Sequence, residues 1–433
     1  MRILWFTNTP SLAVKKISSA YNVGSSWIES METAMVNFDG IELGIAFPYK
    51  VAGMEKIMLE GHPVEYFMVP KYPIGQLGRF VRRISSSMEP RKALKDYMEV
   101  VEMFKPDIVH FFGTESDYTS IIPQLQVPSV IWFQGNLTVY QKMWQVGIPL
   151  WKAFLHERVF DVLNGKTFVH KYYEYAKRVK REQQVFRQGS NFIGRTDWDR
   201  RLVSVMAPQA KYFHCEEAMR NSFFEHQWEP HKNRKKLVLV STIRESLYKG
   251  LETVFETSKI LGEVLDRPLE WRIVGVKPNA TYVRIVKSKV RVSSSERAVK
   301  VLGFKSGPEL AQELLSADAY IHPSHIDNSP NSVCEAMLMG VPVISTNVGG
   351  IPSLLQDKEE GLLVQNGDPY AMAGAILELA NHPEKAVQMG AAARERGLIR
   401  NDTFKICSDL LNIYNRIIYE KDHPVAAKAE KHT

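Results

Sequence analysis

Short apolar runs alternate with amphipathic segments along the whole chain. In the first half, runs rich in β-branched and aromatic residues predict strands at 2–7, 41–47, 64–69, 107–112, 128–133, 166–170, 191–194 and 211–214. Between them, apolar positions at helical spacing predict helices at 25–37, 89–104, 151–162, 171–186 and 197–206. Strands that alternate with helices predict parallel sheets covered on both faces, so the fold class is α/β and doubly wound.

A polar stretch with proline, residues 229–236, separates this series from a second one. After it, strand-type runs begin at 237, 271, 299 and 318, and helices alternate with them to about residue 398. With 433 residues, the chain is long for one core. We therefore expect a first domain at 1–228, a second at 229–401, a terminal helix at 402–421 and a disordered tail at 422–433.

The chemistry begins with two carboxylates eight positions apart. Asp327 lies in a Pro/Asn/Ser loop, and Glu335 lies on the helix that follows. This layout is typical of a ligand crevice at the carboxyl edge of a parallel sheet. The N–H groups of residues 331–333 open the helix toward an anion, and carboxylates accept hydrogen bonds from hydroxyls. The pattern favours a sugar nucleotide, and the alternative is a helix that merely begins after a proline-rich turn.

Two cations five positions apart follow the first strand of the second half. Arg244 and Lys249 lie in the loop between this strand and an amphipathic helix. A guanidinium can bind two phosphate oxygens as a fork, and an ammonium adds a point charge. The spacing indicates a diphosphate site, although a solvated loop with ordinary charges is the simpler interpretation.

Together these residues resemble the retaining glycosyltransferases of family 4, also called group 1, which have the GT-B fold. That family has Glu, seven residues and a second Glu, followed by Ala, a Gly and Pro-Val-Ile. Here Glu335, Ala336, Gly340 and residues 342–344 match, with Asp327 in place of the first Glu. The resemblance implies two Rossmann-like domains facing across a cleft, and a C-terminal helix that crosses back to the first domain.

The resemblance also implies roles for particular residues. Arg244 and Lys249 would stabilise the departing diphosphate, Asp327 would contact the donor sugar, and Glu335 would contact the ribose. Further donor contacts are implied for Gly24, Gly303, Phe304, Lys305, Asn328, Ser329, Pro330, Asn331, Ser332 and Val333.

The first domain is expected to orient the acceptor or sugar through His110, Gln134, Asn136 and Arg195. Many relatives have histidines where this chain has Phe112 and Gln134. Retaining transfer on this fold is usually described as front-face, and it needs no protein base. A half-buried strand histidine is the alternative role for His110. The histidines and the three cysteines have no metal-ligand spacing, so we predict no metal or cofactor.

The charge distribution indicates a second binding partner besides the sugar nucleotide. The net charge is +7, and two segments are strongly basic: 71–95 with seven Lys/Arg against one Glu, and 166–201 with ten against four acids. Basic amphipathic segments can bind an anionic membrane or nucleic acid, or be solvated faces. With a sugar-nucleotide site predicted in the same chain, a membrane is the favoured partner of these segments over nucleic acid. No signal peptide or run of 18 apolar residues is evident, so the expected location is cytoplasmic, peripheral at the plasma membrane.

The expected function is retaining transfer of a sugar from a UDP- or GDP-sugar to a glycan or lipid-linked acceptor, in cell-surface polysaccharide synthesis. One alternative is a nucleotide-sugar epimerase of the same fold. The other is a non-catalytic protein that binds membranes or polyanions. The absence of a GxGxxG motif argues against a dinucleotide oxidoreductase.

Overall fold

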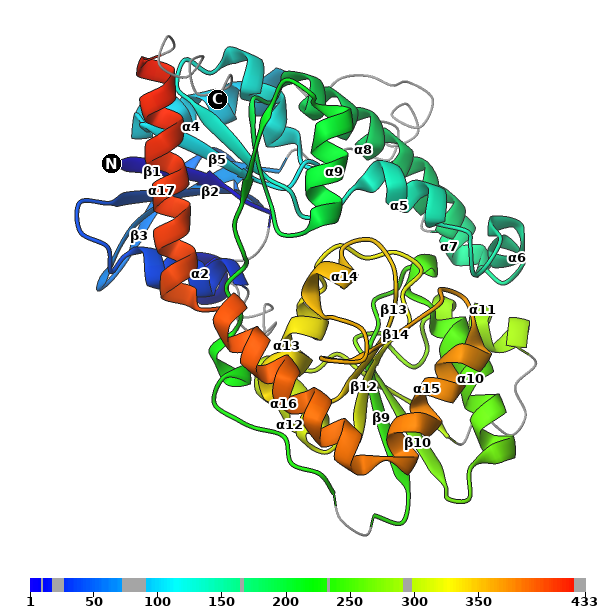
Figure 1. The fold of residues 1–433 in the computed structure, drawn as a ribbon. Helices are drawn as coiled ribbons and strands as arrows, with labels where there is room; N and C mark the ends of the chain where they lie inside the picture. The colour runs from blue at the N-terminus through cyan, green and yellow to red at the C-terminus, as the bar shows by residue number, and fades with distance from the viewer. Residues whose placement is uncertain are drawn as a thin grey trace.

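The computed structural model describes residues 1–8, 11–17, 27–71, 91–163, 167–231, 234–290 and 298–423. Two α/β domains lie one above the other, the first drawn in blue to green and the second in green to orange (Figure 1). None of the described helices is long and apolar enough to span a bilayer. Most of the basic segment 71–95 and nearly all of the predicted tail 422–433 lie outside the described residues.

The first domain contains an eight-stranded sheet in the order β3-β4-β2-β1-β5-β6-β7-β8. All neighbouring pairs are parallel except β3 and β4. The predicted parallel doubly wound sheet is thereby confirmed. The strands are β1 (Arg2–Phe6), β2 (Glu42–Tyr49), β3 (Glu55–Leu59), β4 (His62–Pro70), β5 (Ile108–Phe112), β6 (Ser129–Trp132), β7 (Asn191–Gly194) and β8 (Lys211–His214).

Helices cover both faces of this sheet. One apolar cluster joins it to α1 (Leu12–Ile17), α2 (Trp27–Met35) and α17 (Thr403–Asp422). A second cluster joins the other face to α4 (Arg91–Phe104), η1 (Asp117–Gln124), α8 (Phe168–Gln188) and α9 (Asp197–Met206). Between β6 and α8 the chain forms α5 (Leu137–Met143), α6 (Leu150–Leu155) and α7 (Val159–Leu163).

Two predictions for this region are wrong. Residues 168–170 begin helix α8 and are not a strand, because Thr167 caps the helix by accepting a 3.2 Å hydrogen bond from the His170 amide. The single helix predicted at 151–162 is two short helices, α6 and α7, separated by residues 156–158. The pattern also missed β3, an edge strand whose side chains are largely exposed and therefore lack a buried face.

The second domain contains a six-stranded parallel sheet in the order β11-β10-β9-β12-β13-β14. Its strands are β9 (Leu237–Thr242), β10 (Leu269–Val274), β11 (Val299–Gly303), β12 (Ala319–His322), β13 (Val343–Thr346) and β14 (Leu362–Val364). One face packs on α10 (Leu251–Val264), α11 (Thr281–Val290) and α15 (Pro369–Asn381). The other packs on α12 (Gly307–Leu315), α13 (Asn331–Met339) and α14 (Ile351–Leu354), with α16 (Pro383–Arg400) beyond them.

The last helix returns to the first domain, as the sequence predicted. In Figure 1, α17 runs in red from the end of α16 along the side of the first sheet. Its Tyr414 hydroxyl accepts a 3.0 Å hydrogen bond from the Trp5 indole nitrogen on β1. The apolar side chains of α17 are buried in the first domain's core, so the helix belongs to that core although it follows the second domain.

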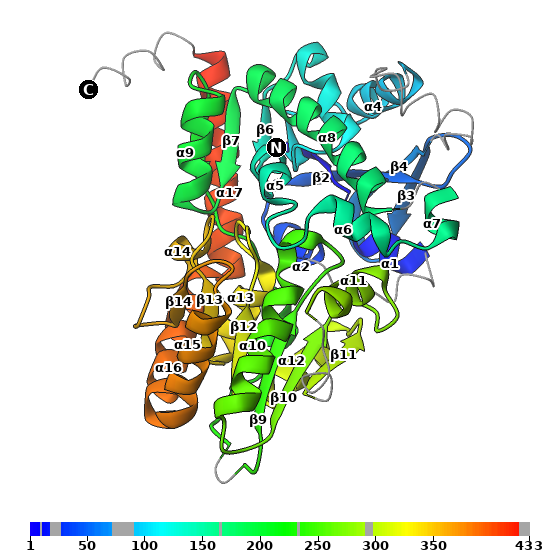
Figure 2. The same cartoon turned by 90° about the vertical axis from the view of Figure 1, so that its right-hand side faces the viewer.

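The segment before α8 joins the domains on the other side. Trp144, Ile148, Ala153 and Phe168 are buried in the apolar cluster that also contains the core of the second domain. Figure 2 shows α6 and α7 near α11 of that domain. Trp144 also packs on Tyr248, with ring centroids 5.6 Å apart. The two domains are therefore linked by the chain passing from α16 into α17 and by the packing of this segment on the second domain.

Candidate functional site

The candidate site lies where the strand order of the second sheet reverses. Chain connections run outward from β9 to β10 on one side and from β12 to β13 on the other, so the loops after β9 and β12 diverge. Such a switch point opens a crevice at the carboxyl ends of the strands. Lys249 is in the first of these loops and Asp327 in the second, as the sequence pattern required.

Lys249 and Asp327 meet directly across the switch point. The Lys249 ammonium lies 2.5 Å from Asp327 Oδ2, and both side chains are largely buried. Lys249 ends the short 3₁₀ helix η3 (Leu247–Lys249), and Gly250 follows with φ +71°. A Cβ on Gly250 would lie 2.0 Å from the Pro323 carbonyl oxygen, so only glycine lets the two loops approach this closely.

Asp327 is held as a carboxylate. His322 Nε2 lies 3.0 Å from the same Oδ2 atom, and the Asn328 amide donates to Oδ1 over 3.3 Å. Burial alone would raise the pKa of Asp327, but Lys249 and His322 together hold that pKa well below its usual value. Burial lowers the pKa of His322 despite the opposing effect of Asp327. A neutral imidazole can donate its Nε2–H to the carboxylate, so Asp327 remains charged beside Lys249.

Glu335 lies one helical turn inside α13 and is also buried. Arg220, which precedes the 3₁₀ turn η2 (Asn221–Phe223), donates from Nε to Glu335 Oε1 over 3.1 Å and also from Nη2. Burial raises the pKa of Glu335, and the charges of Arg220 and Arg244 offset part of this rise. The sequence reasoning missed Arg220, because its partner is 115 residues away and no local motif marks it.

Arg244 completes the cluster of charges. It lies close enough to Glu335 for its charge to lower that residue's pKa. In the part of the chain that the structure describes, the Arg244 side chain makes no hydrogen bond or ion pair, and the residue is exposed. An exposed guanidinium next to an ammonium and an open helix start suits a diphosphate.

The loop before α13 is clamped against the first domain. Asn328 is buried, and its Oδ1 accepts a 2.9 Å hydrogen bond from the Thr196 hydroxyl. The Gly350 amide donates to the Asp327 carbonyl oxygen over 3.1 Å. Asn328 Oδ1 is thus bonded to the first domain, whereas its buried Nδ2 has no hydrogen-bond partner among the described residues, and Asn331 and Ser332 at the start of α13 are partly exposed. Ser329 and Pro330 lie between them, and Val333 is buried.

The predicted base contacts lie at the end of β11, two strands from β9. Gly303 has φ +82°, and Phe304 leaves 55% of its surface exposed. Lys305 lies 3.7 Å from Glu313 and is partly exposed. An exposed aromatic ring beside a glycine turn can stack on a base, so this role stays a prediction. Gly24 lies outside the described residues.

Two first-domain residues with predicted roles in orienting the acceptor or sugar are fully buried. His110 has no exposed surface and bonds through Nδ1 to the Tyr414 hydroxyl, within a cluster of aromatic rings. Asn136 is fully buried and caps α5, accepting from the Val139 amide over 2.7 Å. Both side chains therefore have structural partners inside the first domain, and their roles in orienting an acceptor or sugar stay predictions. Strand ends and helix caps require such polar residues for structural reasons.

Arg195 and Gln134 lie together at the ends of β7 and β6. Arg195 is buried, forms an ion pair with Glu217, and donates from Nη2 to the Gln134 carbonyl oxygen over 3.2 Å. Its charge is therefore compensated inside the first domain. The Gln134 side chain is partly exposed, and its Nε2 makes no hydrogen bond. Gln134 is thus better placed than Arg195 to contact a substrate.

A buried acid orders the adjoining loops of the first domain. Glu182 on α8 accepts hydrogen bonds from the amides of Leu137 and Thr138, over 3.0 and 2.8 Å, and from the Thr114 and Thr138 hydroxyls. Burial raises its pKa, and these donors offset part of the rise. Glu182 therefore fixes the start of α5 relative to β5.

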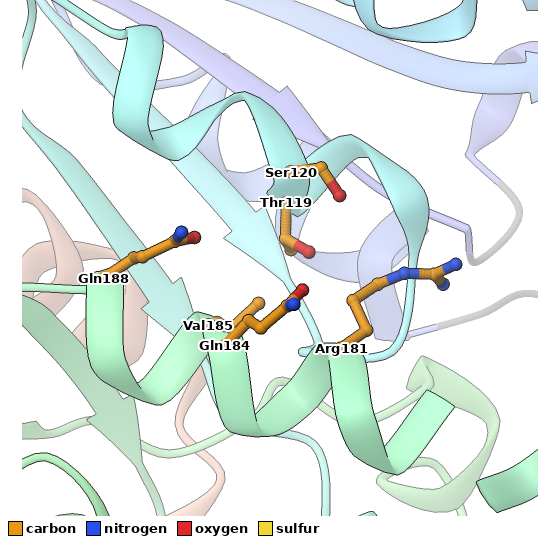
Figure 3. A pocket seen from close by; sticks show the side chains of 6 residues that line it. All are labelled: Thr119, Ser120, Arg181, Gln184, Val185 and Gln188. Atoms are coloured by element: carbon orange, nitrogen blue, oxygen red, sulfur yellow. The ribbon is translucent and has the colours of Figure 1, made fainter. Parts of the chain in front are cut away.

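A small hollow of about 100 Å³ lies elsewhere, between η1 and α8 (Figure 3). Arg181 lines it but donates to the Glu115 carbonyl oxygen over 2.7 Å. The hollow contains none of the predicted site residues, so it plays no part in the site. Among the residues described, no three His, Cys, Asp or Glu side chains are grouped so as to hold a metal.

Comparison with known proteins agrees with this geometry. Residues 222–396 match the family described as glycosyl transferases group 1. AmsK of Erwinia amylovora, an amylovoran biosynthesis glycosyltransferase, is 30% identical over 166 residues, which cover 37% of this chain and 40% of AmsK. WcaL of Salmonella typhimurium, named for colanic acid biosynthesis, is 28% identical over 46% of this chain and 49% of WcaL. The chain thus spans about half the length of the curated relatives it matches.

Solved structures identify the fold over almost the whole chain. Sucrose-phosphate synthase from Thermosynechococcus elongatus superposes with a TM-score of 0.68 at 15% identity, covering 96% of this chain and 99% of that one. Anabaena HepE in complex with UDP-glucose gives 0.61 at 15% identity, covering 96% and 100%. The chain has the GT-B fold, as the resemblance predicted.

Proposed function

We propose that the protein is a retaining glycosyltransferase that takes a nucleotide-diphosphate sugar as donor. The observation that supports this most is the Lys249–Asp327 ion pair at the switch point, with Arg244 and the start of α13 in the neighbouring loops. These groups provide positive charge for a diphosphate and a fixed carboxylate for sugar hydroxyls. The family match of residues 222–396 supports the same assignment.

In the proposed reaction, the bond between the anomeric carbon and the diphosphate oxygen breaks. The acceptor oxygen attacks from the same face, and its proton passes to the departing diphosphate oxygen, so the configuration is retained. Negative charge grows on the diphosphate during this step. Arg244, Lys249 and the N-terminus of α13 would stabilise that charge, and no protein base or metal is needed.

We propose a UDP-sugar as the first donor to test, and a glycan or lipid-linked acceptor in cell-surface polysaccharide synthesis. HepE, which shares the fold, has been crystallised with UDP-glucose. The names of AmsK and WcaL place those relatives in the synthesis of exopolysaccharides. Gln134 at the end of β6 is partly exposed and has a buried Nε2 without a hydrogen-bond partner in the described part of the chain, which supports a role in orienting such an acceptor or the transferred sugar.

Calorimetric titration with a panel of UDP-, GDP- and ADP-sugars tests the donor site. We expect one nucleotide class to bind, with weaker binding by Arg244→Ala. Product analysis by NMR with the bound donor would then give the anomeric configuration. If no nucleotide sugar binds the wild-type protein, the proposed function is wrong; if the product is inverted, only the stereochemistry is wrong.

A further inference from the structure

Large apolar side chains gather on the outer surface of the α6–α7 hairpin, which we define as residues 150–163. Trp151, Phe154, Leu155 and Val159 leave 62, 47, 69 and 75% of their surfaces exposed. Residues 151, 154 and 155 have the spacing that places side chains on one face of a helix. Single exposed apolar residues are ordinary, but four of them in one hairpin form a patch that indicates a binding partner.

The inner face of the hairpin is already covered by the second domain. Ala153 is fully buried in the cluster that contains that domain's core. His156 Nε2 lies 2.5 Å from the Ser288 hydroxyl, and Arg158 lies 3.4 Å from the Asn279 carbonyl oxygen. Figure 1 shows α6 and α7 at the outer end of α8, at the edge of the molecule. The second domain therefore holds the hairpin in place but does not cover its outer face.

The charge around the patch indicates what covers it. The described residues of 142–181, from α5 through the hairpin into α8, include eight Lys/Arg and three Asp/Glu, a net +5 within a chain of net +7. Of these cations, Arg158, Lys171 and Arg181 bond to other parts of the protein. The Lys152 ammonium lies 5.4 Å from the centre of the Trp151 ring. A tryptophan and aliphatic side chains flanked by cations match the interface of an anionic bilayer, where rings lie at headgroup depth and cations meet phosphates.

A second copy of this chain fits the same surface less well. A two-fold dimer would place the patch against itself. The positive segment would then face another positive segment, and like charges across an interface oppose association. An anionic lipid surface satisfies both the apolar side chains and the surrounding charge.

We propose that the α6–α7 hairpin docks the protein on an anionic membrane, with Trp151, Phe154, Leu155 and Val159 entering the headgroup region. The surrounding Lys and Arg side chains contact lipid phosphates. This surface is distinct from the donor site, so the proposal does not depend on the proposed function. It also differs from a flexible anchor, because contacts with α11 hold the hairpin against the second domain.

Vesicle flotation tests the proposal. We expect wild type to float with phosphatidylcholine vesicles containing about one third phosphatidylglycerol, less with phosphatidylcholine alone, and less at about 1 M salt than at about 0.1 M. The double substitution Trp151→Ser and Leu155→Ser should lower partitioning about tenfold or more. Val205→Ser with Tyr370→Ser, at exposed positions on α9 and α15, is the matched control and should float like wild type.

Tryptophan fluorescence tests the same surface without disturbing the fold. All eight tryptophans lie in the described residues, and Trp151 is the exposed one among them. Brominated lipid in the anionic vesicles should therefore quench wild type, and Trp151→Phe should lose most of that quenching.

The outcomes are distinct. Wild type that does not float on anionic vesicles at low salt overturns the proposal, as does quenching that persists in Trp151→Phe. Sedimentation velocity that shows a wild-type dimer, dissociated by the double substitution, would assign the patch to a second copy instead. Thermal unfolding midpoints of the double variant and its control establish that both are folded.

Discussion

The two domains use the polar residues at their strand ends differently. In the second domain, Lys249 and Asp327 from separate loops meet at 2.5 Å, and Arg244 beside them remains exposed. In the first domain, His110 lies within β5 and Asn136 follows β6, yet both are fully buried and bonded inside their own domain. A polar residue at a strand end is therefore a site candidate only where the loops around it leave it facing a shared crevice.

Glycines mark the difference between these regions. A Cβ added to Gly250 would clash with the Pro323 carbonyl oxygen. Cβ atoms added to Gly349 and Gly350 would clash in the same way with the carbonyl oxygens of Asp327 and Asn328. Because of these close approaches, the loops after β9 and β13 both pack directly against the loop after β12. Around β5 and β6, Glu182 orders the loops instead, by accepting hydrogen bonds from the Leu137 and Thr138 amides. The donor side is preorganised by the backbone, whereas the first domain uses its polar side chains to hold itself together.

The largest effect is expected on catalysis, when a cation of the donor site is removed. Lys249→Ala and Arg244→Ala should each lower kcat/KM roughly 30-fold or more, because each removes a cation from the leaving diphosphate. This corresponds to a loss of about 2 kcal/mol or more of transition-state stabilisation. Lys259→Ala, an exposed lysine on α10, is the matched control and should leave kcat/KM unchanged. Steady-state kinetics with the donor found by calorimetry give the comparison. Wild-type rates in Lys249→Ala would remove this residue from the mechanism.

The next effect concerns the backbone that brings the loops together. Gly250→Ala places a Cβ 2.0 Å from the Pro323 carbonyl at φ +71°, so it should cost about 2 kcal/mol of unfolding free energy and weaken donor binding. Gly262→Ala, in the same helix and with no neighbour within 4 Å, should instead stabilise by up to about 1 kcal/mol. Denaturant unfolding measures both. Equal stabilities of the two variants would show that the loop approach is not as tight as described.

The fold was largely predictable from the sequence, because the buried parallel strands read as apolar runs between helices. The exceptions have physical causes. Residues 168–170 combine aromatic and β-branched types that suit a strand, yet the Thr167 cap begins a helix there. Apolar residues at 151–162 resemble a core helix, but five of them are exposed: Trp151, Phe154, Leu155, Val159 and Val162.

The candidate site was predictable only in part. Lys249 meets Asp327, and Arg244 lies near Glu335, because all four follow two adjacent strands of one sheet, and strand order can be inferred from alternation. Arg220, which binds Glu335, could not be foreseen, since only the folded chain brings the interdomain segment to α13. Likewise, burial of His110 depends on Tyr414, 304 residues later, which α17 carries back to the first sheet.

A smaller effect is expected from the charge of Asp327. Its folded pKa lies below the unfolded value of about 3.9, so its contribution to stability is complete above about pH 4 and is lost as pH falls toward the folded pKa. Asp327→Asn should lower the unfolding free energy at pH 7 by about 1–2 kcal/mol and lose less on acidification than wild type does. Asp409→Asn, which breaks an exposed pair with Lys405, is the control and should change stability by less than about 0.5 kcal/mol.

The smallest effect is predicted in the first domain, for substitution of the buried His110. His110→Phe keeps the ring stacking with Phe112 and Trp132, and Tyr414 keeps its bond to Trp5, so the lost hydrogen bond should cost about 1 kcal/mol. Burial lowers the pKa of His110. Its stabilising contribution is therefore complete above the unfolded pKa of about 6.5 and lost as pH falls below it.

The variant should accordingly flatten the loss of unfolding free energy between about pH 6.5 and pH 5, while kcat/KM stays within about twofold of wild type. His226→Gln, an exposed histidine, is the control and should leave the pH profile unchanged. A His110→Phe variant with wild-type stability but a large fall in kcat would return His110 to the reaction. The first domain would then hold a reacting group in its core, and the contrast between the two domains would no longer hold.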